Sequence, residues 1–183
     1  MSVDVRRVRA DEWERVRDLR LDAVRDPAAA IAFLSSYEAE AAHPAAFWQD
    51  RAANAATGDA VAQFVAEADG EWIGTVTVIR WKAGDTDHHG RTVSVARGDV
   101  VGVFVRSENR AGGVVDALLG AAADWARDLG DGALALDVHV DNLRAQRAYR
   151  RAGYVETGLR FTGSIGPELE MSRSLAAADS VAP

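Results

Sequence analysis

The sequence predicts a mixed α/β fold, in which one mixed, mostly antiparallel sheet carries helices on both of its faces. Three observations lead to this prediction. The chain has 183 residues, of which 48% are hydrophobic and 27% charged, as in an ordinary globular domain with a sizeable core. Its centre reads as strand, helix and strand, which implies a parallel pair joined by a crossover helix. The flanking segments read as hairpins, which imply antiparallel pairs.

Each element follows from local patterning. Residues 3–8 alternate as a strand does. Asp11 and Glu14 have capping-box spacing at the start of a helix that Asp26 and Pro27 end. The further expected elements are a helical stretch over 36–56 that breaks at His43-Pro44, strands over 61–66 and 72–81 joined at Asp69-Gly70, a polar loop at 83–90, a strand over 93–105, a helix over 113–129, a strand over 133–138, a helix over 143–151, and strands over 153–159 and 167–175.

Composition and charge exclude several classes of protein. The chain lacks cysteine, so it has no disulfide, thiolate metal site or cysteine nucleophile. Its net charge is -7 with no basic cluster, which argues against nucleic-acid binding. No apolar run approaches the ~20 residues that a bilayer requires, and the N-terminus is charged. We therefore expect a cytoplasmic protein without a membrane or nucleic-acid partner.

One segment has the character of a phosphate-binding loop. A buried strand ends near Val105, a polar turn with Gly112 and Gly113 follows, and a helix begins. Glycines allow backbone N–H groups to approach a ligand, and a helix N-terminus favours a phosphate. The segment is neither a dinucleotide fingerprint nor a nucleoside-triphosphate loop. An ordinary strand–turn–helix connection remains the alternative from this segment alone.

A second segment follows the next strand and makes the interpretation specific. Arg110, Gly113 and the following helix resemble the phosphate loop of the GNAT acetyltransferase superfamily, Q/R-x-x-G-x-G/A. The later segment resembles L-x-V-x-x-x-N-x-x-A-x-x-x-Y-x-x-x-G-F/Y of the same superfamily, at Leu136, Val138, Asn142, Ala145, Tyr149, Gly153 and Tyr154. The resemblance covers roughly residues 3–175, and its specific part is 99–158. It implies a GNAT-type fold with a central, splayed parallel strand pair.

The resemblance also implies a cofactor site. Acetyl-CoA, as co-substrate, would lie between the splayed strands near 100–105 and 134–138. Its pantetheine arm would pair with the backbone of the first strand, and its pyrophosphate would bind the loop amides. The implied cofactor-binding residues are Val103, Phe104, Val105, Arg110, Ala111, Gly112, Gly113, Val114, Val115, Asp116 and Asn142. Val115 departs from the family pattern, because a β-branched residue stands where the family prefers glycine or alanine.

The resemblance implies direct attack of an amine on the thioester. Tyr149 would protonate the departing thiolate, although it could instead be a helix residue that packs on the sheet. Asp99 would accept the amine proton if burial raises its pKa, and the alternative is an ordinary aspartate at a strand start. His139 is a second candidate base, and a structural role is its alternative.

Two regions without a recognisable motif are expected to shape the acceptor pocket. One is the loop 83–90, whose His88 and His89 are too few ligands for a metal site, so we expect none. The other is 28–56, which we expect to form the acceptor-side wall. It offers the aromatic and acidic residues Phe33, Tyr37, Glu40, Phe47 and Trp48. Packing of Phe47 and Trp48 in the core, and a solvated Glu40, are the alternatives.

Three functions are compatible with these patterns. The first is an N-acetyltransferase that acts on a primary amine of a small molecule, a peptide or a protein. The second is an acyl-CoA-binding sensor or regulatory domain without significant catalysis. The third is an interaction protein that has lost the cofactor site. We expect a single domain over 1–175 and a disordered tail over 176–183. A homodimer is expected only by analogy with the family.

Overall fold

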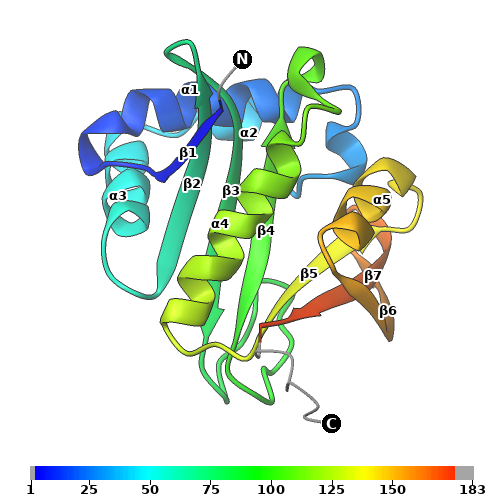
Figure 1. The fold of residues 1–183 in the computed structure, drawn as a ribbon. Coiled ribbons are helices and arrows are strands. Elements are labelled where there is room, and N and C mark those ends of the chain that lie inside the picture. The colour runs from blue at the N-terminus through cyan, green and yellow to red at the C-terminus, as the bar shows by residue number, and fades with distance from the viewer. Residues whose placement is uncertain (1–2, 176–183) are drawn as a thin grey trace, which may run out of the picture.

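The computed structural model describes residues 3–175. Their strands form one seven-stranded mixed sheet (Figure 1). The strand order is β1-β2-β3-β4-β5-β7-β6, and every neighbouring pair is antiparallel except β4 and β5. The predicted fold class is therefore confirmed. The strands are β1 (Asp4–Arg7), β2 (Val61–Ala68), β3 (Glu71–Trp81), β4 (Arg97–Val105), β5 (Ala133–His139), β6 (Val155–Gly163) and β7 (Gly166–Ser174).

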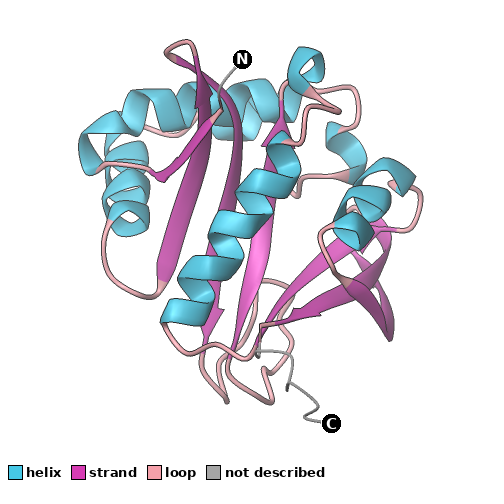
Figure 2. Cartoon of the chain, in the orientation of Figure 1, coloured by secondary structure: helices cyan, strands magenta, loops and turns pink. Residues whose placement is uncertain are grey.

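Helices cover both faces of the sheet (Figure 2). Helix α4 (Val114–Asp128) packs on one face and buries the larger core with its apolar side. Helices α1 (Trp13–Arg25) and α3 (Ala45–Ala56) pack on the opposite face and bury a second core. Helix α2 (Tyr37–Ala41) connects them, and α5 (Leu143–Arg151) lies beyond β5. The break expected at His43-Pro44 is confirmed.

The central strands β4 and β5 are paired over only two positions. Gly98 lies opposite Leu134, and Asp99 lies opposite Ala135. A Cβ atom on Gly98 would lie 2.6 Å from Leu134 Cδ2, so glycine is what allows this close approach. Both strands continue past these pairs, and β5 leaves β4 at an angle (Figure 1). The expected splay is present, and it opens the sheet at its centre.

The start of α1 differs from the prediction. A 3₁₀ turn over Ala10–Glu12 precedes the helix, which begins at Trp13. The Glu12 carboxylate, and not a cap built on Asp11 and Glu14, accepts a hydrogen bond from the Arg9 backbone N–H at 2.8 Å. The capping interaction therefore lies earlier in the chain, because Arg6 and Arg9 also hold this carboxylate by ion pairs.

The strand expected over 93–105 begins only at Arg97. The Asp87 carboxylate accepts hydrogen bonds from the backbone N–H groups of His89 and Arg91, both at 2.9 Å, and turns the chain back on itself. A single bridge between Thr86 and Thr92 closes this loop. Val93 therefore pairs within this loop, through backbone hydrogen bonds to Gly84 and Asp85 at 2.9 Å, and not with a strand of the sheet. Of the helices within 3–175, none has the length and apolar character of a membrane span.

Candidate functional site

A cavity of about 720 Å³ opens where β4 and β5 separate. This is an ordinary size for a small-molecule site. It extends from the N-terminus of α4, along β4, to the face of the sheet that α1 and α3 cover. Segments far apart in sequence form its wall, namely 28 and 31–34, part of α3, 100–105, 109–115, 137–139, and much of α5.

The edge of β4 that faces β5 is open along the cavity. Phe104 and Val105 pair with β3 on one side, at Thr75 and Gly74. On the other side, β5 has already diverged, and Val103 to Val105 line the cavity. An open strand edge presents backbone groups that an extended ligand can pair with. These are the residues that the resemblance assigns to the pantetheine arm.

The predicted phosphate loop presents unpaired backbone amides. Within residues 3–175, no hydrogen-bond acceptor contacts the N–H groups from Ala111 to Asp116. Gly113 adopts φ 77° as the N-cap of α4, and Ala111 adopts φ 69°, a left-handed conformation that is unusual for alanine. Free N–H groups at the start of a 15-residue helix are able to bind an anion.

Arg110 holds the loop in place with its side chain. Its Nε atom donates a hydrogen bond to the Val105 carbonyl at 2.9 Å, and its guanidinium also pairs with Asp26 just after α1. The guanidinium thus connects the end of β4 with the segment that forms the acceptor-side wall. Arg110 lines the cavity, but these bonds give its side chain a positioning role in the loop.

Three arginines of α5 were missed by the motif analysis. Arg144, Arg147 and Arg151 line the cavity, and the Arg151 guanidinium lies 3.5 Å from the Asp116 carboxylate at the start of α4. Their spacing of three and four residues puts them on one face of the helix. That spacing is visible in the sequence and could have identified them. They add positive charge around the loop in a chain whose net charge is -7.

Tyr149, on α5, lies in the cavity wall. Its side chain is buried, and its hydroxyl group makes no hydrogen bond with any residue that the structure describes. Burial raises the pKa of Tyr149 to about 12, so the phenol is protonated at neutral pH. A protonated hydroxyl without a partner, facing a cavity, has the properties of a proton donor.

Asn142 is engaged at the start of α5. Its Oδ1 atom accepts a hydrogen bond from the Ala145 N–H at 3.2 Å, and its Nδ2 atom donates to the Ile31 carbonyl at 3.3 Å. Asn142 therefore caps α5 and ties it to the wall segment. Asn142 also lines the cavity. A contact between Asn142 and the cofactor is implied by the resemblance alone and stays a prediction.

Asp99 is buried at the point where the splay begins. It forms an ion pair with Arg97 at 2.9 Å and lies behind the residues that line the cavity. Burial is the largest of the effects that raise the pKa of Asp99 to about 6, and the nearby charges of Asp137 and Asp87 add to it. Asp137 lies on the neighbouring strand β5, two residues beyond Ala135, which is the partner of Asp99, and it lines the cavity. The raised pKa of Asp99 therefore suits a general base, whereas Asp137 is the carboxylate that lies on the cavity wall.

His88, His89 and His139 all line the cavity. His139 accepts a hydrogen bond from the Asp141 N–H through Nδ1 at 3.1 Å, so this nitrogen carries no proton. His88, His89 and Asp137 place potential metal ligands within 4.8 Å of one another. The Arg91 guanidinium, however, bonds the Asp137 carboxylate at 2.7 Å and would repel a cation there. We therefore do not assign a metal site to these three residues.

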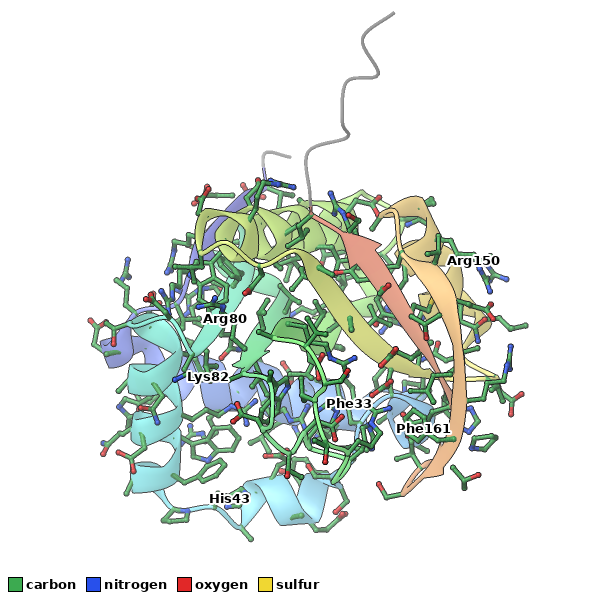
Figure 3. The ribbon with its side chains drawn as sticks, turned by 90° about the horizontal axis from the view of Figure 1, so that it is seen from below. Phe33, His43, Arg80, Lys82, Arg150 and Phe161 are labelled. Atoms are coloured by element: carbon green, nitrogen blue, oxygen red, sulfur yellow. The ribbon has the colours of Figure 1, made fainter. Side chains whose placement is uncertain are left out.

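The wall segment 28–56 contributes to the cavity, but mostly through other side chains than expected. Phe33 lines the cavity, and Figure 3 shows it near the middle of the molecule. Tyr37, Glu40, Phe47 and Trp48 do not line it. Trp48 is core, and Glu40 is buried rather than solvated, because Arg20 and Ser35 bond its carboxylate. The polar side chains of Arg51 and Asn54 line the cavity instead.

Val115 fits the fold without conflict. Its half-buried side chain packs against the core beneath α4 and also lines the cavity beside the phosphate loop. Valine thus replaces the small residue of the family pattern at a position that a ligand on the loop amides would contact. The effect of this side chain on binding stays a prediction.

Comparisons with known proteins agree with this geometry. Residues 13–154 match the sequence profile of the acetyltransferase (GNAT) family. A similar curated protein is an aminoglycoside N(6')-acetyltransferase type 1 from Stenotrophomonas maltophilia, which is 37% identical over 90 residues. That match spans 49% of this chain and 56% of the relative, so only about half of the relative's length is covered.

Similar solved structures cover nearly the whole chain. A GNAT-family acetyltransferase from Streptococcus pneumoniae superposes with a TM-score of 0.72 at 16% identity, over 94% of this chain and 99% of that one. A PaiA N-acetyltransferase from Thermoplasma acidophilum, determined in complex with coenzyme A, gives a TM-score of 0.70 at 15% identity, over 95% of this chain and 99% of that one. At these identities the likeness concerns the fold.

Proposed function

The chain belongs to the acetyltransferase (GNAT) family, and on this premise we propose that it transfers the acetyl group of acetyl-CoA to a primary amine. The observation that carries the proposal is the open cavity between β4 and β5, with a free strand edge on one wall and unpaired helix-terminal amides at one end. These two features match the two parts of CoA, an extended amide-containing arm and a pyrophosphate.

The binding residues follow from this arrangement. The backbone of Val103 to Val105 pairs with the pantetheine arm, and the N–H groups from Ala111 to Asp116 hold the pyrophosphate. Arg144, Arg147 and Arg151 add charge for the phosphates. Arg110 and Asn142 keep the loop and the start of α5 in position through the bonds described above.

Acetyl-CoA supplies an activated acyl group, and the residues of the chain move the protons. The amine nitrogen forms a bond to the acyl carbon while the carbon–sulfur bond breaks. The Tyr149 hydroxyl donates its proton to the departing thiolate, and its high pKa keeps that proton in place until then. Tyr149 then recovers a proton from solvent, which restores the phenol.

The carboxylates at the start of the splay receive the proton that the amine must lose. Asp137 lies on the cavity wall, and Asp99 lies behind it with a pKa of about 6. The proton passes to Asp99 through water along this wall, because Asp99 is the carboxylate whose raised pKa suits a base at neutral pH.

The test is a thiol-release assay with acetyl-CoA and a panel of primary amines that includes amino acids, polyamines, peptides and aminoglycosides. Aminoglycosides belong in the panel because the relative from S. maltophilia is named for them. Turnover that falls strongly in Tyr149→Phe supports the proposal. Binding of acetyl-CoA without turnover of any amine would favour an acyl-CoA sensor, and the absence of binding would contradict both functions.

A further inference from the structure

Two arginines line the acceptor side of the cavity, on the face of the sheet that α1 and α3 cover. Arg20 comes from α1 and Arg51 from α3, and Asn54 lies one turn further along α3. A small recess of about 10 Å³ is lined by both arginines and by Gln63, which are part of the cavity wall as well. This end of the cavity is polar and positively charged.

Arg20 has an anion bonded directly to it, whereas Arg51 has none among residues 3–175. Arg20 pairs with the buried Glu40 carboxylate at 2.7 Å and covers the Phe33 ring at 4.8 Å. Arg51 forms no hydrogen bond or ion pair with any residue in 3–175. The Trp48 ring lies 5.9 Å from its guanidinium, and the Glu40 carboxylate that Arg20 binds acts on it only through space. Burial, with the charge of Arg20, lowers the pKa of Arg51. A half-buried guanidinium that has no anion bonded to it and that lines a cavity is suited to bind an anion there.

The opposite end of the acceptor side carries the reverse charge. Asp137 on β5 and Glu168 on β7 both line the cavity, and their strands are direct neighbours. Arg91 and His89 compensate Asp137. Glu168 is 3% exposed, and its Oε2 atom has no hydrogen-bond partner among the described residues. Burial raises the pKa of Glu168, as expected for a carboxylate that lacks a cation.

We propose that the acceptor is an amino acid or a similar small amine that carries a carboxylate, with its carboxylate bound by Arg51 and its amino group facing Glu168. The inference rests on the proposed acetyl transfer, because it names the acceptor of that reaction. The planar guanidinium can bind a carboxylate through two parallel hydrogen bonds, and Asn54 and Gln63 can complete the polar surroundings. A polycation fits less well, because Arg51 would repel its second positive charge.

The experiment uses matched pairs of acceptors that differ only in the carboxylate, each an amino acid and the amine left after its removal. We expect kcat/KM to be about 10- to 100-fold higher for the carboxylate-bearing member, as for loss of a charged hydrogen-bond partner. Arg51→Gln should abolish this preference by raising KM for the amino acid alone. Arg51→Lys should keep part of it. Arg17→Gln, at an exposed site on α1, is the control.

The outcomes separate this inference from the proposed function. A wild-type preference for polycations, or a carboxylate preference that persists in Arg51→Gln, would overturn the inference while acetyl transfer stands. If no amine is acetylated, the proposed function fails, and the same pairs are then titrated as ligands in the presence of CoA. Binding of the amino acid that is lost in folded Arg51→Gln would still support the inference, and no binding would overturn it.

Discussion

The two halves of the cavity are built in different ways. The proposed cofactor half consists mainly of backbone groups, namely the open edge of β4 and the amides at the start of α4, with the arginines of α5 beside them. The acceptor half consists of side chains from α1, α3, β5, β7 and the loop before β4. Backbone groups recognise one constant ligand, and the fold fixes them. Side chains can be exchanged without disturbing the sheet, so the acceptor half is where specificity can vary.

The largest expected effect lies where the two halves meet. Tyr149→Phe should lower kcat about 100-fold or more, because it removes the proton donor, and it should leave acetyl-CoA binding nearly intact. Tyr154→Phe is a matched control, since the Tyr154 hydroxyl is buried, has no partner within 3–175 and does not line the cavity. Equal kcat in Tyr149→Phe and wild type would remove the assigned role.

The second effect concerns Asp99, the proposed base behind the wall of the acceptor half. Only a deprotonated Asp99 accepts a proton, so kcat/KM should rise with pH through an inflection near the Asp99 pKa of about 6. Asp99→Asn should remove that inflection and lower kcat/KM at neutral pH about 10- to 100-fold. A full pH profile of both proteins checks this. An inflection that persists in Asp99→Asn would assign the proton to another group, with Asp137 the next candidate.

The cofactor half offers a third test within one helix. Arg147 lines the cavity and makes no ion pair among the described residues, whereas Arg150 pairs with Glu156 at 2.7 Å (Figure 3 labels Arg150 at the outer side). Arg147→Gln should weaken acetyl-CoA binding about 5- to 10-fold, with a smaller salt dependence. Arg150→Gln should leave it unchanged. Equal effects of the two substitutions in titration calorimetry would contradict the assignment of the α5 arginines.

The smallest effect concerns the departure from the family motif. Val115→Gly should tighten acetyl-CoA binding a few-fold, because it clears space beside the loop amides. It should also destabilise the fold by about 1 kcal/mol or more, because glycine weakens a helix and the core loses a valine contact. Val115→Ala separates the two effects. An unchanged or weaker affinity in both variants would show that Val115 does not obstruct the ligand.

The backbone half could be predicted from the sequence far better than the side-chain half, because its parts are local segments of the chain. The loop after β4 and the start of α5 are local segments, so their motifs predicted the strand, turn and helix that the structure contains. Arg51 and Glu168 are far apart in sequence, and only the folded sheet brings them to one cavity. The burial of Glu40 could not be predicted from local sequence, because its partner Arg20 lies on another helix. The strand start at Arg97 was missed because Val93 pairs within the preceding loop, at Gly84 and Asp85, and not with the sheet.

The most direct test of the central claim is a thermal melt with acetyl-CoA and, separately, with free CoA. At about a hundredfold excess over Kd, a ligand of the folded state contributes about 2.7 kcal/mol. For a domain of this size, Tm should therefore rise by roughly 5–10 °C with either ligand. An unchanged Tm at millimolar acetyl-CoA would contradict the claim that the opening between β4 and β5 is a cofactor site.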